Sequence, residues 1–456
     1  VESAGLVKFD FLGLKTLTVL ETAVKLIARR GIAVDLSALP LDDPATYALL
    51  AKGETVGVFQ LESTGMRKAI ADIKPDRFED IIALVALYRP GPMANIPVYG
   101  ARKQGLETPD YMHPLLEPVL KETFGIIVYQ EQVMQIAQIL SGYSLGEADL
   151  LRRAMGKKIK AEMDTQRVRF VDGALKQGLT KEHADTIFDL LAKFADYGFN
   201  KSHAAAYALV AYHTAYLKAN FPVEFLAATM TLDMSNTDKL ADFRREAMRL
   251  GIGVEPPSVN RSREYFDVQD GAILYSLAAV KGVGGQAVEH LVAVRGERRF
   301  ADLSDFAHRI DPKQLNKRTL ESLVAAGAFD ELEKDRARLF EGLDQVVAAA
   351  SRVRDDASAG QGALFGGTAS VEPIRLNASK GWLPAERLQR EHAAVGFYLS
   401  AHPLDEYRGV LEKMRVQMWA EFQGSVKRGA NFGRLAGTVT SRQERKTKTG
   451  NKMGIV

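Results

Sequence analysis

The sequence predicts a mainly α-helical protein with short β segments near both ends. Through residues 41–250 the apolar residues mostly recur at helical spacing, and few segments alternate. Gly and Pro divide this block into separate helices, most strongly at the rigid turn Tyr88-Arg89-Pro90-Gly91-Pro92. Apolar and polar residues alternate instead around residues 6–12, 265–275 and 427–456, where we therefore expect strands.

The composition excludes several classes of protein and site. The 456 residues are enough for about three domains, and 46% hydrophobic with 26% charged residues is typical of a folded chain. Zero cysteine excludes disulfides, thiolate zinc sites and a cysteine nucleophile. The longest apolar run, residues 81–88, is far shorter than the roughly 18 residues of a membrane span. We therefore expect a cytoplasmic protein without membrane contact, and the net charge of +3 gives no hint of a polyanionic partner.

Both ends of the chain predict strands that are cut short. A strand over residues 6–12 places Lys8, Asp10 and Leu12 on one face, because side chains alternate along a strand. Residues 452–456 break off in what we interpret as the middle of another strand. Since the first residue is Val rather than Met, we expect a segment of a longer polypeptide with an incomplete active site.

The first helix is expected over residues 15–30, where Gly31 ends a run of helically spaced apolar residues. Further on, Gly142-Tyr143-Ser144-Leu145-Gly146 matches the nucleophile pattern of serine hydrolases, but that elbow requires a preceding strand. Residues 132–140 have helical spacing, so we interpret the pattern as a turn between helices. The sequence contains no P-loop, dinucleotide-binding or H-E-x-x-H motif.

A cluster of cations follows this turn. Arg152 and Arg153 are expected at the end of a helix that Gly156 breaks, and Lys157 and Lys158 come next. The helix dipole explains part of such a cluster, but seven cations against two acids between residues 152 and 169 exceed what it requires. Phosphate binding and a solvated face are equally open at this point.

A second candidate anion site lies within residues 197–207. Ser202 is the expected N-cap of a helix whose N-terminus carries Lys201 and His203, and such a terminus attracts anions. His203 and Tyr207 are four residues apart and share one face. The alternative interpretation is a packing face of small residues with a capped start, because three alanines follow His203.

Residues 278–288 predict a helix-hairpin-helix motif, in which a short helix and a second helix flank a glycine hairpin. The hairpin residues are Lys281, Gly282, Gly284 and Gly285. Such glycines let backbone amides point at one phosphate of a DNA strand, which positions the protein without reading bases. Residues 316–329 resemble a second, degenerate copy, and helices are expected through residues 277–350.

Residues 351–371 are rich in Ser, Ala, Gly and Asp and predict a mobile linker. Within it, Gln361, Leu364 and Phe365 place an apolar pair in a polar tract, as in a docking peptide. The Gln-x-x-Leu-Phe spacing suits a ligand of a sliding clamp.

The last thirty residues predict a basic β-hairpin. Residues 427–456 carry eight Lys or Arg against the single acid Glu444. Arg445, Lys446 and Lys448 are the expected DNA contacts on this hairpin.

These motifs, in this order, closely resemble the alpha subunits of bacterial DNA polymerase III, the C-family of replicative DNA polymerases. The resemblance covers essentially the whole chain. It rests on Gly5-Leu6-Val7-Lys8-Phe9-Asp10-Phe11, Gly57-Val58-Phe59-Gln60-Leu61-Glu62, Tyr88-Arg89-Pro90-Gly91-Pro92, Tyr129-Gln130-Glu131-Gln132, Leu151-Arg152-Arg153-Ala154-Met155-Gly156-Lys157-Lys158, Tyr197-Gly198-Phe199-Asn200-Lys201-Ser202-His203 and Gly396-Phe397-Tyr398-Leu399-Ser400-Ala401-His402-Pro403.

The resemblance implies a domain layout. In chain order it gives the last strand of a nucleotidyltransferase-type palm (1–15), fingers (16–250), a connector with short strands (251–276), tandem helix-hairpin-helix elements (277–350), a linker with the clamp-binding peptide (351–371), a helical connector (372–426) and the truncated start of an OB-fold (427–456).

The resemblance also implies the activity of a DNA-directed DNA polymerase, which extends a primer on template DNA with dNTPs. Asp10 aligns with the third of three aspartates that hold two Mg²⁺ ions, and Lys8 with a residue beside the triphosphate. Since the other two aspartates lie outside the chain, we expect the isolated chain to be inactive. The implied partners are the sliding clamp (the beta subunit) and the other holoenzyme subunits. The residues implied to bind dNTP are Arg152, Arg153, Lys157, Lys158, Asn200, Lys201 and His203.

Two alternatives stay open. A non-catalytic DNA-binding scaffold of helix-hairpin-helix and OB elements would explain residues 277–456, but it leaves Lys8, Asp10 and the cations of the fingers without a purpose. The error-prone paralogue of the same polymerase is the other alternative, and the Gln-x-x-Leu-Phe pattern favours the replicative form.

Overall fold

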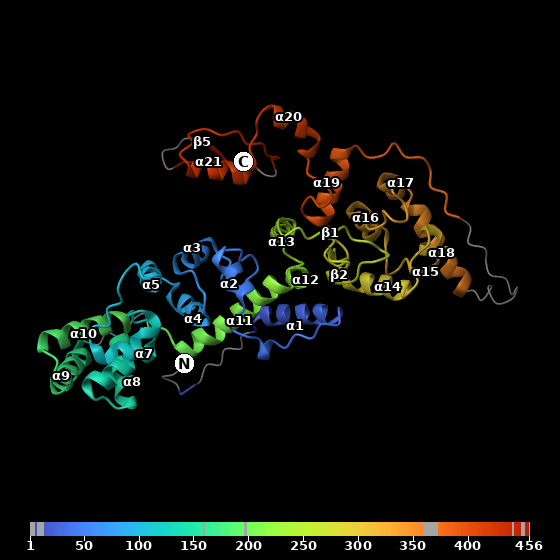
Figure 1. Ribbon diagram of the computed structural model, residues 1–456. Helices are drawn as coiled ribbons and strands as arrows, with labels where there is room; N and C mark the ends of the chain where they lie inside the picture. Colours follow the sequence, from blue (N-terminus) through green and yellow to red (C-terminus); the bar gives the residue numbers. More distant parts are fainter. Residues whose placement is uncertain are drawn as a thin grey trace. The chain divides into compact units, whose positions relative to one another are not determined.

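The computed structural model describes residues 5–6, 13–157, 160–195, 198–358, 373–439, 442–447 and 452–455. Within these residues the chain is mostly helical, as the sequence predicts (Figure 1). The chain divides into two compact units, Val1–Leu232 with Phe243–Ile252, and Asp233–Asp242 with Gly253–Val456. Helix α13 (Thr237–Arg249) contributes residues to both.

Helix α11 (Lys201–Asn220) is at the centre of the first half of unit 1. It packs against α1, α2, α4 and α12. One fully buried row of this helix consists of small side chains at spacings of three and four, Ala204, Ala208, Ala211 and Ala215. The helices around it are α1 (Lys15–Ala28), α2 (Pro44–Ala51), α3 (Thr64–Ile73), α4 (Phe78–Leu87), α5 (Ile96–Lys103) and α12 (Pro222–Leu232), and together with α11 we call them the α11 cluster.

A second group of helices follows in the sequence and forms its own core. The helices are α6 (Glu117–Leu120), α7 (Gln130–Ser141), α8 (Leu145–Lys157), α9 (Lys160–Lys176) and α10 (Lys181–Ala195), and we call α7 to α10 the α7–α10 cluster. Figure 1 shows these four helices grouped together. Their core is apolar and fully buried, with Val133, Ile136, Leu140, Leu151, Phe170 and Phe188 among its members.

Residues 126–129 join the two clusters of unit 1. Ile126 and Val128 belong to the core of the α11 cluster, whereas Ile127 belongs to that of the α7–α10 cluster. This alternation is that of extended backbone, whose successive side chains point to opposite sides. Tyr129 pairs in parallel with Phe199, so the two segments that link the clusters lie side by side.

The turn between α7 and α8 has the form that the sequence predicts. Gly142 ends α7 with a φ of 67°, and Ser144 directly precedes α8, so no strand leads into a nucleophile elbow. The prediction that Gly156 breaks the helix was wrong, because α8 runs through it to Lys157. Leu151 and Met155 are buried in the core, and this packing outweighs the cost of about 1 kcal/mol for a helical glycine.

Unit 2 begins with a small three-stranded sheet. Strand β3 (Ala272–Leu274) pairs in parallel with β1 (Val254–Glu255) and antiparallel with β2 (Asp267–Gln269). The turn from β2 to β3 is Asp270-Gly271, with φ values of 52° and 77°, which is the signature of a tight hairpin turn. The predicted strands and turn are therefore confirmed.

The helices of unit 2 follow this sheet. They are α14 (Gly285–Arg295), α15 (Leu303–Arg309), α16 (Lys317–Ala326), α17 (Arg336–Glu341), α18 (Leu343–Ser358) and α19 (Pro384–Val395). The short helix expected from residue 277 was wrong, since residues 277–282 form turns. The stretch is short and ends at Gly282 (φ 81°), and the Lys281 amide donates to the carbonyl of Ala394 rather than within a helix.

Helix α18 also differs from expectation. It continues to Ser358, into the stretch where the sequence predicts a mobile linker from residue 351. Val346 and Ala350 anchor the helix in the core, and the Ala and Arg residues that follow favour helix. The predicted clamp peptide with Gln361, Leu364 and Phe365 lies outside the described residues, as does the palm strand with Lys8 and Asp10.

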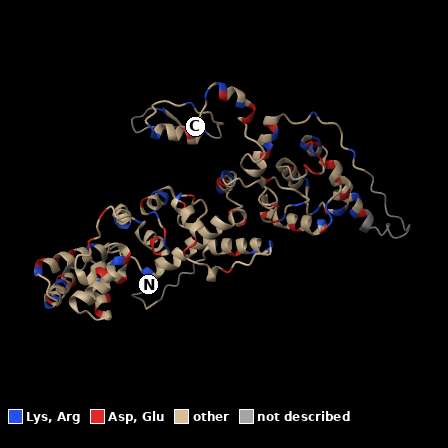
Figure 2. Ribbon diagram, in the orientation of Figure 1, with Lys and Arg blue, Asp and Glu red and all other residues tan. Residues whose placement is uncertain are grey.

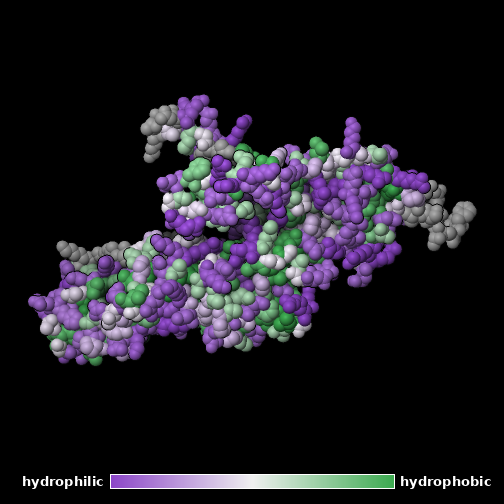
Figure 3. All heavy atoms as spheres, turned by 45° about the horizontal axis from the view of Figure 1, so that its top comes forward, coloured by the Kyte–Doolittle hydropathy of each residue, from purple (hydrophilic) through white to green (hydrophobic). Residues whose placement is uncertain are grey.

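The C-terminal part of unit 2 carries two short helices and a hairpin. After α20 (Arg408–Lys413) and α21 (Trp419–Lys427), strand β4 (Gln443–Lys446) pairs antiparallel with β5 (Lys452–Ile455). The predicted basic hairpin is confirmed, whereas the OB-fold stays a prediction. On the face shown in Figure 3 hydrophilic residues predominate. Among the residues with described structure, no helix has the length and apolar character needed to cross a membrane.

Candidate nucleotide and DNA interface

The N-terminus of α11 is fixed by the extended segment before it. The Phe199 amide donates to the carbonyl of Val128, and its own carbonyl accepts from the Gln130 amide. The helix therefore starts at Lys201, and the Oδ1 atom of Asn200 accepts from the His203 amide at 2.7 Å. The prediction that Ser202 is the N-cap was wrong by two residues, since Asn caps as well as Ser and the extended backbone ends at Asn200.

Two carboxylates already occupy this helix N-terminus. The Lys201 amide donates to both oxygens of Glu131, at 3.1 and 3.0 Å, and Asn200 donates to the same carboxylate at 3.0 Å. The Lys201 ammonium lies 2.6 Å from Glu122. In this structure, carboxylates of the protein itself therefore occupy the position of the predicted anion site, which stays a prediction. Sequence reasoning missed Glu122 and Glu131, although Glu131 lies within one of the motifs that carry the family resemblance.

The buried ring of Tyr129 packs against the side chain of Lys201. The Lys201 ammonium lies 5.4 Å from the centre of the Tyr129 ring, which is a favourable cation–π position. Tyr129 is fully buried, and burial raises the pKa of its hydroxyl far above the usual range, so the ring stays neutral at all physiological pH values. Tyr129 thus contacts the Lys201 ammonium as a neutral ring and adds no charge of its own.

His203 and Tyr207 share one face of α11, as the sequence predicts. Their ring centres are 4.5 Å apart, and His203 is also 5.3 Å from Phe199. The guanidinium of Arg89 lies over the ring of Phe199, 4.4 Å from its centre. The rigid Tyr88–Pro92 turn therefore delivers Arg89 to the same face as His203.

The cations of α8 lie in the other helical cluster. Arg152 donates through two nitrogens to one oxygen of Asp149, at 3.0 and 2.8 Å, and Arg153 lies 2.8 Å from the second oxygen. The hydrogen bond from Arg152 is the main reason that the pKa of Asp149 lies below its usual range. The single negative charge of Asp149 balances only one of the two arginines, so Arg152 and Arg153 together keep a net positive charge.

The structure does not join the α8 cations directly to α11. Within the described ranges, no hydrogen bond or ion pair connects Arg152 or Arg153 to Lys201 or His203. Lys157 lies at the end of α8, and Lys158 falls outside the described residues. Lys and Arg are interspersed with Asp and Glu along the helices (Figure 2), so each candidate cation has to be considered together with its partner.

The predicted helix-hairpin-helix glycines lie at the exposed start of α14. Gly284 precedes the helix without a side-chain cap, and Gly285 is its first residue. Both glycines are exposed, and a side chain added at either would meet nothing within 4 Å, so there is room for a ligand beside this turn. Val283 is buried and anchors the hairpin, while Lys281 is exposed beside it. In the predicted second copy, Asn316 caps α16 by accepting from the Thr319 amide.

The basic hairpin projects cations into solvent. Arg445 and Lys446 are exposed on β4, and Glu444 forms an ion pair with Lys452 across the hairpin at 2.9 Å. Lys448 falls outside the described residues.

The metal prediction has no counterpart in the described residues. Among them, no group of three His, Cys, Asp or Glu side chains could hold a metal ion. Asp10, the predicted ligand, is not part of the described structure.

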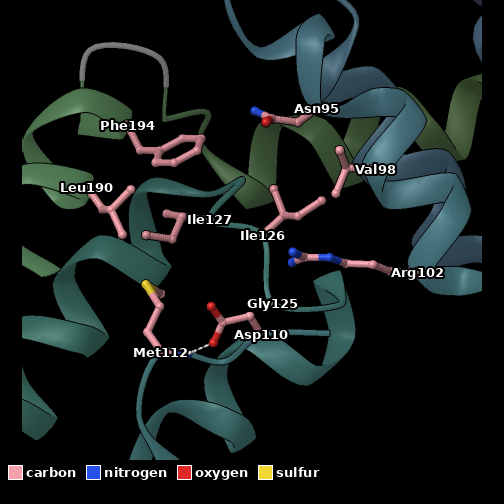
Figure 4. Close-up of a pocket in the computed structure, with 10 residues that line it drawn as sticks. All are labelled: Asn95, Val98, Arg102, Asp110, Met112, Gly125, Ile126, Ile127, Leu190 and Phe194. Atoms are coloured by element: carbon pink, nitrogen blue, oxygen red, sulfur yellow. Dashed lines mark hydrogen bonds between the residues drawn. The ribbon is translucent and has the colours of Figure 1, made fainter. Parts of the chain in front are cut away.

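A cavity of about 180 Å³ lies where the two clusters of unit 1 meet (Figure 4). Ile126, Ile127 and Phe194 form apolar walls, and the guanidinium of Arg102 points into it from α5. Arg102 is held by Glu107 at 2.8 Å and by the Phe124 carbonyl at 3.2 Å. The cavity is smaller than the roughly 300–1,000 Å³ of ligand pockets, so we assign no ligand to it.

Comparisons with known proteins indicate the family of this chain. Residues 16–178 match the family described as the bacterial DNA polymerase III alpha subunit finger domain, and residues 251–339 match a helix-hairpin-helix motif family. The chain is 55% identical over 457 residues to DNA polymerase III subunit alpha of Caulobacter vibrioides, 46% over 472 residues to that of Haemophilus influenzae and 41% over 495 residues to that of Rickettsia prowazekii. Each alignment includes 100% of this chain and 40%, 41% and 42% of the relative.

The chain thus spans about two-fifths of the length of the curated relatives that it matches. The predicted family resemblance is confirmed: along its whole length the chain is related to the bacterial DNA polymerase III alpha subunit, and residues 16–178 and 251–339 match the finger-domain and helix-hairpin-helix families.

Proposed function

We propose that this chain supplies the fingers and the duplex-binding part of a DNA-directed DNA polymerase that replicates the bacterial chromosome. The observation that carries the proposal is the start of α11, where Lys201 and the first helical amide each hold a carboxylate. A helix N-terminus and an ammonium that bind carboxylates suit the phosphates of an incoming dNTP equally well. The match of residues 16–178 to the finger family favours a polymerase over a non-catalytic DNA-binding scaffold.

In this proposal the cations of α8 and α11 bind the triphosphate from two sides. Guanidinium groups offer paired donors to phosphate oxygens, so Arg152 and Arg153 would exchange part of their contact with Asp149 for the nucleotide. Lys201 and His203 would approach the phosphates along the α11 axis. The further members of this set are Lys157, Lys158 and Asn200.

Phosphoryl transfer also requires a group that stabilises the reacting oxygens. Asp10, together with two aspartates outside this chain, would hold two Mg²⁺ ions, which would supply Lewis-acid stabilisation of the negative charge that develops during phosphoryl transfer. Lys8, two residues before Asp10, would add positive charge beside the triphosphate. The other candidate site residues of this chain would bind and orient the nucleotide and the DNA.

Unit 2 would hold the duplex without reading its sequence. The amides of the exposed Gly284 and Gly285 can donate to one phosphate, with Lys281 beside them and Gly282 allowing the hairpin turn. Arg445, Lys446 and Lys448 would add contacts from the basic hairpin. A clamp contact through Gln361, Leu364 and Phe365 would keep the polymerase on DNA, together with the other holoenzyme subunits in the cytoplasm.

The experiment is steady-state primer extension by the full-length polymerase with Lys201→Ala. We expect the KM for dNTP to rise about tenfold or more, because a charge-assisted hydrogen bond to phosphate is lost. The affinity for primer-template DNA should not change. Lys239→Ala is the matched control, since Lys239 is a half-exposed lysine of α13 that pairs with Asp233. An unchanged KM for dNTP in Lys201→Ala would contradict the proposal.

A further inference from the structure

The aromatic row on α11 continues beyond His203 and Tyr207. The ring of Phe59, from a distant part of the sequence, lies 5.7 Å from that of Tyr207 at an interplanar angle of 34°. The same angle relates Tyr207 to His203. Phe59, Tyr207 and His203 therefore form one row of neighbouring tilted rings, which we call the aromatic row.

The aromatic row lies beside the buried row of alanines on α11. Those alanines are fully buried, whereas His203 is exposed and Phe59 and Tyr207 are only half-buried. Solvent thus reaches part of each of these residues.

A clamped loop holds Phe59 in position. The Phe59 amide donates to the hydroxyl of Thr214 on α11, and the ammonium of Lys218 donates to the carbonyls of Glu54 and Val56. Gln60 follows with a φ of 59°, an uncommon conformation for a residue other than glycine. Its side chain is exposed next to the row. Hydrogen bonds to Thr214 and Lys218 of α11 thus fix the loop that carries Phe59 and Gln60.

We propose that the aromatic row is a stacking surface for unpaired bases of template DNA. This inference rests on the proposed function, because it takes DNA as the partner. Aromatic faces bind unpaired bases of any sequence, whereas duplex bases are already stacked on each other. Arg89 lies over Phe199 at the His203 end of the row, where its positive charge can attract the DNA backbone. The amide of Gln60, at the Phe59 end, can donate to and accept from base edges.

The test compares two DNA substrates bound to the full-length polymerase. One is a blunt duplex and the other is the same duplex with a single-stranded template overhang. Tyr207→Ala should weaken binding of the overhang substrate about tenfold, the usual loss for one stacked base, and leave binding of the blunt duplex unchanged. Tyr207→Phe should restore the overhang affinity because it keeps the ring. Leu209→Ala is the matched control, since Leu209 is an exposed apolar residue about 200° around the same helix.

A second measurement uses the wild-type protein, in case Tyr207→Ala unfolds. A 2-aminopurine base at the first unpaired template position should lose fluorescence on binding, because stacking on a ring quenches it. Three results would overturn the inference: no quenching in the wild type, an equal loss for both DNA substrates, or a higher KM for dNTP with unchanged overhang affinity. If the wild type does not bind even the blunt duplex, the proposed function itself fails.

Discussion

The ammonium of Lys218 lies 2.6 Å from the carboxylate of Glu246, and both side chains are buried. Lys218 belongs to α11, and Glu246 to the part of α13 that is packed in unit 1. Arg249 adds two hydrogen bonds to Glu246, at 2.8 and 2.9 Å. Because Lys218 also donates to two carbonyls of the loop that carries Phe59, this ion pair connects α13 to the aromatic row.

Lys218→Met is expected to lower the free energy of unfolding by about 3 kcal/mol. Breaking a buried pair typically costs about 3–5 kcal/mol, and Arg249 still partners Glu246, which favours the lower end. Urea unfolding monitored by circular dichroism measures the change. Lys25→Met is the control, since Lys25 forms an exposed i,i+4 pair with Glu21 and should lose less than about 0.5 kcal/mol. Equal losses in both variants would contradict a structural role for the buried pair.

Acid should weaken unit 1 through Glu246. Burial raises the pKa of this carboxyl, but hydrogen bonds from Arg249 and Lys218 outweigh it and hold the pKa at about 2. Since the pKa in the unfolded chain is about 4.3, the stabilisation is complete above that pH and is lost as the pH falls through about 2. Urea midpoints of wild type and Glu246→Gln between pH 6 and pH 2 test this. The difference between the two proteins should shrink towards pH 2, and a constant difference would argue against it.

Gly125→Ala is expected to destabilise the junction of the two clusters. Gly125 has a φ of 82°, and an added Cβ would lie 2.2 Å from the carbonyl oxygen of Asp110. Both the left-handed backbone and the clash oppose alanine, so we expect a loss of about 2–4 kcal/mol in the free energy of unfolding. Gly146→Ala is the matched control, because this helical position has open space and should gain up to about 1 kcal/mol. A neutral Gly125→Ala would mean that residues 110–125 can shift at little cost.

Glu131→Gln is expected to lower the KM for dNTP several-fold in the full-length polymerase. The substitution keeps an oxygen that can accept from Asn200 and Lys201, but it removes the negative charge that competes with phosphate. Primer extension over a range of dNTP concentrations measures the KM. Glu117→Gln, an exposed acid of α6 that pairs with Lys121, is the control. A higher KM would indicate that Glu131 positions Lys201 rather than competing for it.

Lys281→Ala is expected to weaken duplex binding at all sequences alike. The lost phosphate contact should also reduce the slope of log affinity against log salt concentration by about 1. Titrations of duplex DNA at several salt concentrations measure both quantities. Arg298→Ala is the control, since Arg298 is exposed and paired with Asp305. A loss that depends on DNA sequence would contradict a backbone contact.

Local patterns in the sequence predicted those elements whose cause is local. Helical spacing predicted α1, the turn chemistry of Asp270-Gly271 predicted the β2–β3 hairpin, and alternation predicted β4 and β5. Errors arose where distant residues decide the outcome. Burial of Leu151 and Met155 carries α8 through Gly156, and the pairing of Phe199 with residues near Tyr129 moves the start of α11.

The candidate site was predictable in its charges but not in its partners. The motif at residues 197–203 predicted Lys201 and His203 as charged site residues. Their partners were not predicted, because Glu122 and Glu131 lie 79 and 70 residues before Lys201 in the sequence. Phe59 joins the aromatic row from a segment about twice as far away in the sequence. No period or spacing within one sequence encodes such pairings, because they depend on how the helices pack.

The alternation of residues 126–129 has a consequence for how unit 1 unfolds. Ile126 and Val128 contribute to one core and Ile127 to the other, so a single stretch of backbone belongs to both. Opening of either core would pull apolar side chains out of its neighbour. We therefore expect the backbone amides of the two clusters to exchange with solvent in one shared cooperative event, although each cluster has a separate core.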